Sequence, residues 1–457
     1  MQKEAQLSTE QRLLLSLLGR RTEPHDSAEI LSLLHQVNWS NFLNIASVDL
    51  YPYVAFNLEP YRNLLEVPPE WERLVKTRRF TAVQNLLVHH ELGKILQSLR
   101  ESGIPALAVK GIVLAYSAYP DLSLRPMSDL DLLVPPGRRE EALRVLQRLE
   151  YRYPEGALAI NRDHFSYLGP NQELALPLRL RTSTVLVEIH SQLECSEPLF
   201  PMPIEEFWSR STLVDLQGLR VGTLSPEDFL FHVCLHLSRS HRFEKGLLPL
   251  VDLKLLLESR LDWNWAGIAE RSLRYRCATW MFLTLEAARN LVGAPVPDSF
   301  FRALPQPHDP TKLWCLLDQK IWAQGGPRVP LFIPLLLAES SWRTRAHMIL
   351  IRARLVGKRE LDPEPTFAGF VRRTRLYLRR LLATVRTKIP FYAVAWKTGK
   401  LKLHTIRQQA ALLRSSNALF QLIEQETRCA DKNHLAGGTS QALFENSENH
   451  QGPIRVK

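Results

Sequence analysis

The sequence predicts an α+β fold in which a small mixed sheet lies between an N-terminal and a C-terminal helical region. Two observations support this prediction. From Leu13 to about Leu99, apolar residues recur at the three- and four-residue spacing of helix faces. From Ile104 onward, short apolar runs of strand character alternate with helical segments. At 457 residues the chain exceeds the usual size of one hydrophobic core, so we expect several domains.

The elements around the sheet follow from periodicity, turn residues and caps. Apolar runs predict strands at 106–109 and 129–134 and a third strand within 182–193. Helices are expected over 111–119 and 138–149. A further helix is expected to begin after Ser225, which has the chemistry of an N-cap, with Pro226 in the first turn.

Composition indicates a folded protein with anionic partners. A hydrophobic content of 45% and a charged content of 23% are ordinary for globular domains. The net charge of +11 favours nucleotides, nucleic acids or acidic membrane surfaces. The five cysteines form no CxxC pair, which argues against a zinc module and fits a reducing, cytoplasmic location. No transmembrane segment is expected, because the strongest apolar run, 329–338, is too short and contains two prolines.

Acidic side chains on two of the predicted strands indicate a metal site. Asp129 and Asp131 are one residue apart, and side chains alternate along a strand, so both project from one face. Neighbouring anions repel unless a cation compensates them, and Mg²⁺ prefers carboxylates together with phosphate oxygens. Glu188 and His190 share one face of the third strand. We therefore interpret these residues as a metal–nucleotide site.

Three motifs carry a resemblance to a known family. Lys110–Gly111, Arg125–Val134 (RPMSDLDLLV) and Val187–His190 (VEIH) resemble the signature of the nucleotidyltransferase superfamily, which has a DNA polymerase β-like fold. More narrowly, they resemble a bacterial group called the uncharacterised nucleotidyltransferase family, and the likeness covers roughly residues 13–342. The wider superfamily usually carries Gly-Ser at the start of the helix after the first strand, where this chain has Gly111 followed by Ile112.

The resemblance implies a reaction and a set of catalytic residues. It implies transfer of a nucleoside monophosphate from a nucleoside triphosphate, with ATP the expected substrate, to an unidentified hydroxyl acceptor with release of pyrophosphate. Two Mg²⁺ ions would be held by Asp129, Asp131 and Glu188, the three expected catalytic and metal-binding residues. Glu188 could also take the proton of the acceptor hydroxyl.

Five further residues are expected to contact the nucleotide. Lys110 would supply a point charge for the phosphates, and Gly111 would allow close approach at a helix N-terminus. The full set is Lys110, Gly111, Arg125, Ser128 and His190.

Several residues keep more than one interpretation. Arg125 could pair with the triphosphate, hold the loop before Asp129 or pair with the aspartates. His190 could bind phosphate or metal or be structural. His232 and His236 have a helical spacing that zinc can use, but no third ligand is apparent, which favours core or cleft histidines. Asp252 could pack within its helix or contact nucleotide.

Two other functions stay open. A non-catalytic nucleotide-sensing or scaffold protein could retain the fold. A glycosyltransferase could also use the DxD motif, but it would need a longer nucleotide-binding region before that motif.

We expect five segments along the chain. The basic segment is rich in arginine and lysine and could face an acidic partner or a membrane surface, and the polar, aperiodic tail is expected to be disordered. The segments are an N-terminal helical region (1–100), the nucleotidyltransferase core (101–200), a helical substrate- or nucleotide-binding region (201–340), the basic helical region (341–430) and the tail (431–457).

Overall fold

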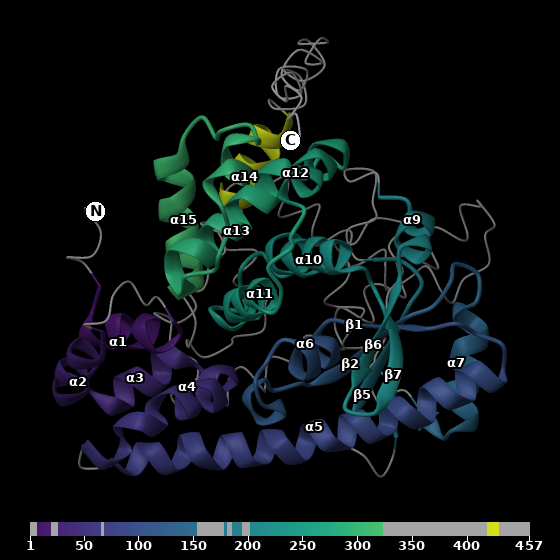
Figure 1. Cartoon of the computed structure of the whole chain (residues 1–457), viewed down its shortest axis with the longest axis horizontal. Coiled ribbons are helices and arrows are strands. Elements are labelled where there is room, and N and C mark those ends of the chain that lie inside the picture. The colour runs from purple at the N-terminus through teal and green to yellow at the C-terminus, as the bar shows by residue number, and fades with distance from the viewer. Residues whose placement is uncertain are drawn as a thin grey trace, which may run out of the picture.

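The predicted α+β fold is confirmed by the computed structural model, in which helices surround a small mixed sheet (Figure 1). The structure describes residues 7–19, 26–64, 68–152, 178–180, 185–193, 202–322 and 418–428. The apolar run 329–338, the tail 431–457 and all of the basic region 341–430 except residues 418–428 lie outside these ranges. No helix in the described ranges is long and apolar enough to cross a membrane.

The central sheet has five strands in the order β1-β2-β5-β4-β3. β2 pairs in parallel with β5 and antiparallel with β1, and β4 is antiparallel to both β5 and β3, so the sheet is mixed. The strands are β1 (Leu107–Val109), β2 (Asp129–Leu133), β3 (Tyr151–Arg152), β4 (Leu178–Leu180) and β5 (Leu186–His190).

The N-terminal region is helical, as predicted. Its last helix, α5 (Pro69–Glu101), has 33 residues and runs along one edge of the molecule, below the other helices and the sheet in Figure 1. The predicted inner-face residues of α5, from Val88 to Leu99, are buried. The preceding elements are α1 (Thr9–Leu17), α2 (Asp26–Gln36), α3 (Trp39–Ala46), η2 (Val48–Leu50), α4 (Tyr51–Leu58) and η3 (Glu59–Leu64).

The core helices lie within two residues of the predicted ranges. α6 (Gly111–Ser117) follows β1, and α7 (Arg139–Arg148) follows β2. Between α6 and β2, the predicted loop contains one short helical turn, η4 (Leu122–Leu124).

A β-hairpin that the sequence did not predict packs on the edge of the main sheet. β6 (Thr212–Leu216) and β7 (Leu219–Thr223) are joined by Gln217 and Gly218, both with positive φ, as a two-residue hairpin turn requires. Thr223 Oγ1 donates to the Ala108 carbonyl at 2.8 Å, which ties the hairpin to β1. The hairpin therefore supports the strand that precedes Lys110.

The remaining described residues are mostly helical. The predicted cap of α10 is confirmed, since the Ser225 side chain accepts from the Asp228 backbone N–H. A helical segment at 418–428 packs through Phe420 on Trp280. The elements are α9 (Ile204–Ser209), α10 (Pro226–Leu235), the π-helical η5 (His236–Ser240), α11 (Leu248–Glu258), α12 (Trp265–Arg274), α13 (Ala278–Val292), α14 (Asp298–Arg302) and α15 (Pro310–Trp322).

Candidate metal centre

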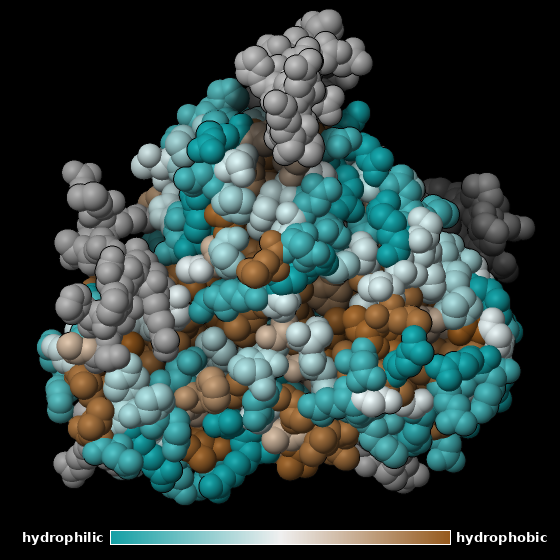
Figure 2. Space-filling model, viewed as in Figure 1, coloured by the Kyte–Doolittle hydropathy of each residue, from teal (hydrophilic) through white to brown (hydrophobic). Residues whose placement is uncertain are grey.

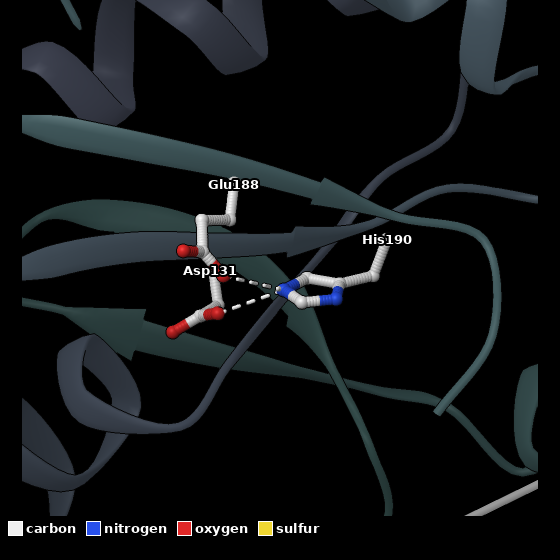
Figure 3. A group of neighbouring side chains, drawn as sticks. All are labelled: Asp131, Glu188 and His190. Atoms are coloured by element: carbon white, nitrogen blue, oxygen red, sulfur yellow. Dashed lines mark hydrogen bonds and ion pairs between the residues drawn. The ribbon is translucent and has the colours of Figure 1, made fainter. Parts of the chain in front are cut away.

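Two neighbouring parallel strands bring the acidic residues together. In the pairing of β2 with β5, Asp131 lies opposite Glu188 and Leu133 lies opposite His190. Paired residues on adjacent strands project to the same face, and residues two apart on one strand share that face. Asp131, Glu188 and His190 therefore converge on one side of the sheet (Figure 3).

The His190 imidazole contacts both carboxylates. His190 Nε2 lies 2.8 Å from Asp131 Oδ1 and 3.6 Å from Glu188 Oε2. Because a carboxylate can only accept, the imidazole Nε2–H is the donor to Asp131. The Asp131 side chain is 3% exposed, whereas that of Glu188 is 22% exposed. The cluster is thus buried on the Asp131 side and open to solvent on the Glu188 side.

The cluster has the donor set of a divalent-metal site. One ligand atom from each of Asp131, Glu188 and His190 lies within 4.8 Å of the others. Two carboxylates and an imidazole suit a divalent cation. Asp129, a predicted ligand, is not in this group, although it lies two residues before Asp131 on β2. The structure therefore brings together two of the three predicted ligands, Asp131 and Glu188, and the third side chain of the cluster is His190.

The two aspartates of the DxD motif have opposite electrostatic environments. Burial would raise the pKa of Asp131, but the charge of Lys110 and the contact with His190 outweigh it and hold that pKa well below its usual range. Burial and the adjacent charge of Asp131 raise the pKa of Asp129, although Lys110 and a hydrogen bond with Ser128 oppose the rise. Asp131 is therefore firmly ionised, while Asp129 is the more easily protonated carboxylate.

Lys110 occupies a strained turn between β1 and α6. Its backbone has φ 59° and ψ −128°, a conformation that L-residues other than glycine rarely adopt. From this turn Lys110 Nζ donates to Asp131 Oδ1 at 2.9 Å, and the side chain is 13% exposed. The strain is consistent with a functional position, because it aims a cation at the acidic cluster.

Arg125 is bound by Asp252 of α11. Its Nε and Nη2 each donate to Asp252 at 2.8 Å, and Tyr119 Oη donates to the same carboxylate at 2.8 Å. Burial raises the pKa of Tyr119 well above its usual value, so the phenol stays a donor. The ion-pair partner of Arg125 is therefore Asp252 and not an aspartate of the DxD motif, and this pair holds the loop that leads into Asp129, as one of its expected roles requires.

Gly111 has a structural role besides the predicted approach of phosphate. A Cβ built at Gly111 would lie 2.5 Å from Arg125 Nη1, so the missing side chain makes room for the guanidinium. Ser128 is exposed beside Asp129. Of the five expected nucleotide contacts, His190 belongs to the cluster of Asp131, Glu188 and His190, and Lys110 donates to it.

Asn85 is a site-supporting residue that the sequence reasoning missed. It is fully buried on α5, and its amide Nδ2 donates to the carbonyls of Leu122 and Arg125, the latter at 2.8 Å. Tyr116 Oη donates to the Asn85 carbonyl at 3.1 Å. One signal was present in the sequence, since Asn85 is a polar residue in the apolar stripe that continues through Val88 and Leu92.

His232 and His236 lie in the helical region and not in the metal-competent cluster. Their rings stack with centroids 5.9 Å apart, and His236 Nε2 lies 2.9 Å from His241 Nε2. Among the described residues, the cluster that could hold a metal ion consists of Asp131, Glu188 and His190 and does not include these two histidines. The structure therefore favours the core interpretation over a zinc site.

The mixed sheet presents Asp131 and Glu188 from adjacent strands, with the Lys110–Gly111 turn beside them, which is the arrangement expected of a nucleotidyltransferase. The family model described as uncharacterised nucleotidyltransferase matches residues 35–293, more than half of the chain. The chain therefore belongs to the uncharacterised nucleotidyltransferase family. The match extends from the end of α2 to the end of α13, so it includes the sheet, the hairpin and α11. Neither the curated proteins nor the solved structures gave a match.

Proposed function

We propose that this protein is a divalent-metal-dependent nucleotidyltransferase that transfers a nucleoside monophosphate from a triphosphate, with ATP the expected donor, to a hydroxyl acceptor. The observation that carries the proposal is the convergence of Asp131, Glu188 and His190 beside Lys110. Family membership supports the reaction class. The acceptor could be a small molecule, a sugar, a protein or an RNA.

The donor set fits a divalent cation, because two carboxylates and one imidazole lie within reach of a common point. Asp131, Glu188 and His190 would hold it, and Asp129 is the carboxylate available to a second Mg²⁺. Bound metal would polarise the α-phosphate and neutralise charge on the departing pyrophosphate.

The protein's own residues would bind and orient the substrates. Lys110, held at the buried end of the cluster, would add positive charge for the triphosphate. Glu188 is the most exposed member of the cluster, so it is the carboxylate best placed to accept a proton from an incoming hydroxyl. Arg125 would act indirectly, since its pair with Asp252 fixes the loop that leads into Asp129.

One observation favours a non-catalytic nucleotide-binding protein as the second candidate. Where the superfamily usually has a serine hydroxyl for the triphosphate, Ile112 is fully buried in the core. Other donors would have to replace that hydroxyl for turnover. A protein that binds nucleotide without transfer would not need them.

The test separates binding from turnover. Calorimetry would measure binding of Mg²⁺, Mn²⁺ and the four nucleoside triphosphates, and a pyrophosphate assay would measure transfer to candidate acceptors. We expect Asp131→Asn and Glu188→Gln to weaken metal binding by at least about tenfold. Glu140→Gln, which removes a carboxylate that is 74% exposed on α7, is the matched control and should bind as wild type does.

The outcomes distinguish the candidates. Unchanged metal and nucleotide binding in Asp131→Asn would contradict the proposed site. Tight binding of triphosphate with no pyrophosphate release for any acceptor would favour the non-catalytic protein. Binding of a nucleotide-sugar without triphosphate binding would favour a glycosyltransferase.

A further inference from the structure

An apolar patch lies on the solvent side of α5, away from the metal centre. Four large apolar residues of this helix are exposed: Phe80 (68%), Val83 (59%), Leu86 (54%) and Leu87 (46%). At 3.6 residues per turn they fall within one sector of the helix, opposite the buried residues. We call these four residues the α5 outer face. Contiguous exposed apolar side chains of this kind mark an interaction surface more often than chance exposure does.

Basic residues lie at the N-terminal end of the α5 outer face. Lys76 lies one turn before Phe80 and Arg79 lies directly before it; both are exposed, in the same sector of the helix. Beyond Leu87, Lys94 pairs with Glu91 at 3.2 Å. No acidic residue occurs between Arg73 and His90. Lys76 also pairs with Glu72 at 2.9 Å, but both side chains are about 70% exposed, so that pair is weak. The surface is therefore apolar in the middle and cationic at its N-terminal end.

The position of α5 makes this surface accessible to a broad partner. The helix forms one edge of the molecule along its whole length, roughly 50 Å at 1.5 Å per residue (Figure 1). In Figure 2, hydrophobic colour reaches the lower edge of the molecule, where α5 runs. A helix that lies along an outer edge of the molecule can contact an extended, flat partner along its whole length.

The charge beside the apolar residues points to an anionic occupant. From Arg73 to His90 the helix carries four basic residues and no acidic one. An anionic lipid surface satisfies both features. Apolar side chains enter the boundary between headgroups and acyl chains, and flanking cations meet lipid phosphates.

We propose that the α5 outer face docks on an anionic membrane surface, with Phe80, Val83, Leu86 and Leu87 inserted and Lys76 and Arg79 paired with lipid headgroups. This proposal is independent of the proposed function. It can hold whether or not the metal centre is catalytic.

The experiment is vesicle co-sedimentation of the full chain. The probes are vesicles of phosphatidylcholine alone and vesicles that also contain phosphatidylglycerol. One variant carries Phe80→Ser, Val83→Ser and Leu87→Ser, and its matched control carries Leu213→Ser and Leu261→Ser, which remove apolar side chains that are 61% and 98% exposed elsewhere.

We expect the wild type and the control to bind the anionic vesicles, and the triple variant to bind at least about fivefold more weakly. The double variant Lys76→Gln/Arg79→Gln should bind more weakly at low salt and lose most of its salt dependence. Its matched control replaces two exposed arginines elsewhere, Arg220→Gln/Arg302→Gln. All variants should unfold at the wild-type temperature, because the substituted side chains are exposed.

Three results would overturn the proposal. The first is equal vesicle binding by the triple variant and the wild type, which would assign any lipid binding to another part of the chain. The second is equal binding of both vesicle types. The third is a dimer, measured by light scattering, that dissociates in the triple variant while vesicle binding stays unchanged, which would assign the surface to a second copy.

Discussion

The ion pair between Arg125 and Asp252 gives the sharpest test of how the site loop is held. Asp252 is 5% exposed at its side chain and accepts three hydrogen bonds, two from the Arg125 guanidinium and one from Tyr119 Oη. Asp252→Ala would leave a buried guanidinium without its counter-charge, which costs about 3–5 kcal/mol in comparable buried pairs. The orphaned phenol adds roughly 1 kcal/mol. Since the two terms overlap, we expect a loss of about 4 kcal/mol in the free energy of unfolding.

Urea unfolding at neutral pH measures this loss, and the chain offers a control. Asp262→Ala breaks a pair with Arg260 of the same 2.8 Å length, but Asp262 is 79% exposed, so the free energy of unfolding should hardly change. Replacing both buried partners, as Arg125→Met with Asp252→Leu, should recover much of the stability, because no charge is then left buried. If Asp252→Ala is no more harmful than Asp262→Ala, the pair does not hold the loop and the reasoning fails.

Three further predictions concern the turn and the aspartates. Gly111→Ala should lower the free energy of unfolding by about 1–3 kcal/mol in urea unfolding, since its Cβ would meet Arg125 Nη1 at 2.5 Å and the guanidinium is fixed. Asp129→Asn should unfold at a higher temperature than wild type at pH 7 yet bind Mg²⁺ more weakly in calorimetry, because burial and the charge of Asp131 raise the pKa of Asp129. The pKa of Asp131 is held well below its usual range in the folded protein. The ionised carboxylate therefore stabilises the fold fully above the pKa of about 3.9 that Asp has in the unfolded chain, and this stabilisation is lost as pH falls through the folded-state pKa. Urea unfolding at several pH values would compare the free energies of unfolding of wild type and Asp131→Asn. Their difference should be constant from about pH 7 to 5 and shrink below about pH 4. A difference that shrinks between pH 7 and 5 would contradict this assignment.

The elements that carry the site could be predicted because their signals are local. Apolar alternation located β2 and β5, and the Ser225 cap located the start of α10. The β6–β7 hairpin escaped prediction because both strands are short and most of the side chains of β6 are exposed, so only β7 shows a brief apolar alternation. Its other local signal is the Gln217–Gly218 turn.

The site itself was predictable in part. Motif resemblance predicted that Asp131 and Glu188 meet, and the parallel register of their strands brings this about. The partner of Arg125 was not predictable, since Asp252 lies 127 residues further along the chain and many arginines and acids could have paired. His190 was expected near the nucleotide, but its place among the metal-competent side chains follows from the strand register, which periodicity alone does not give.

The strained turn at Lys110 links these observations. A non-glycine residue at φ 59° and ψ −128° costs about 1–3 kcal/mol and persists only where surrounding contacts enforce it. Before the turn, Thr223 of β7 holds the Ala108 carbonyl, and after it Arg125, fixed by Asp252 of α11, packs on Gly111. Both restraints come from residues beyond 201, outside the segment that holds the acidic cluster. The conformation that aims Lys110 at Asp131 is therefore enforced by contacts that β7 and α11 make with the sheet and the site loop, and both of these elements lie within the family match.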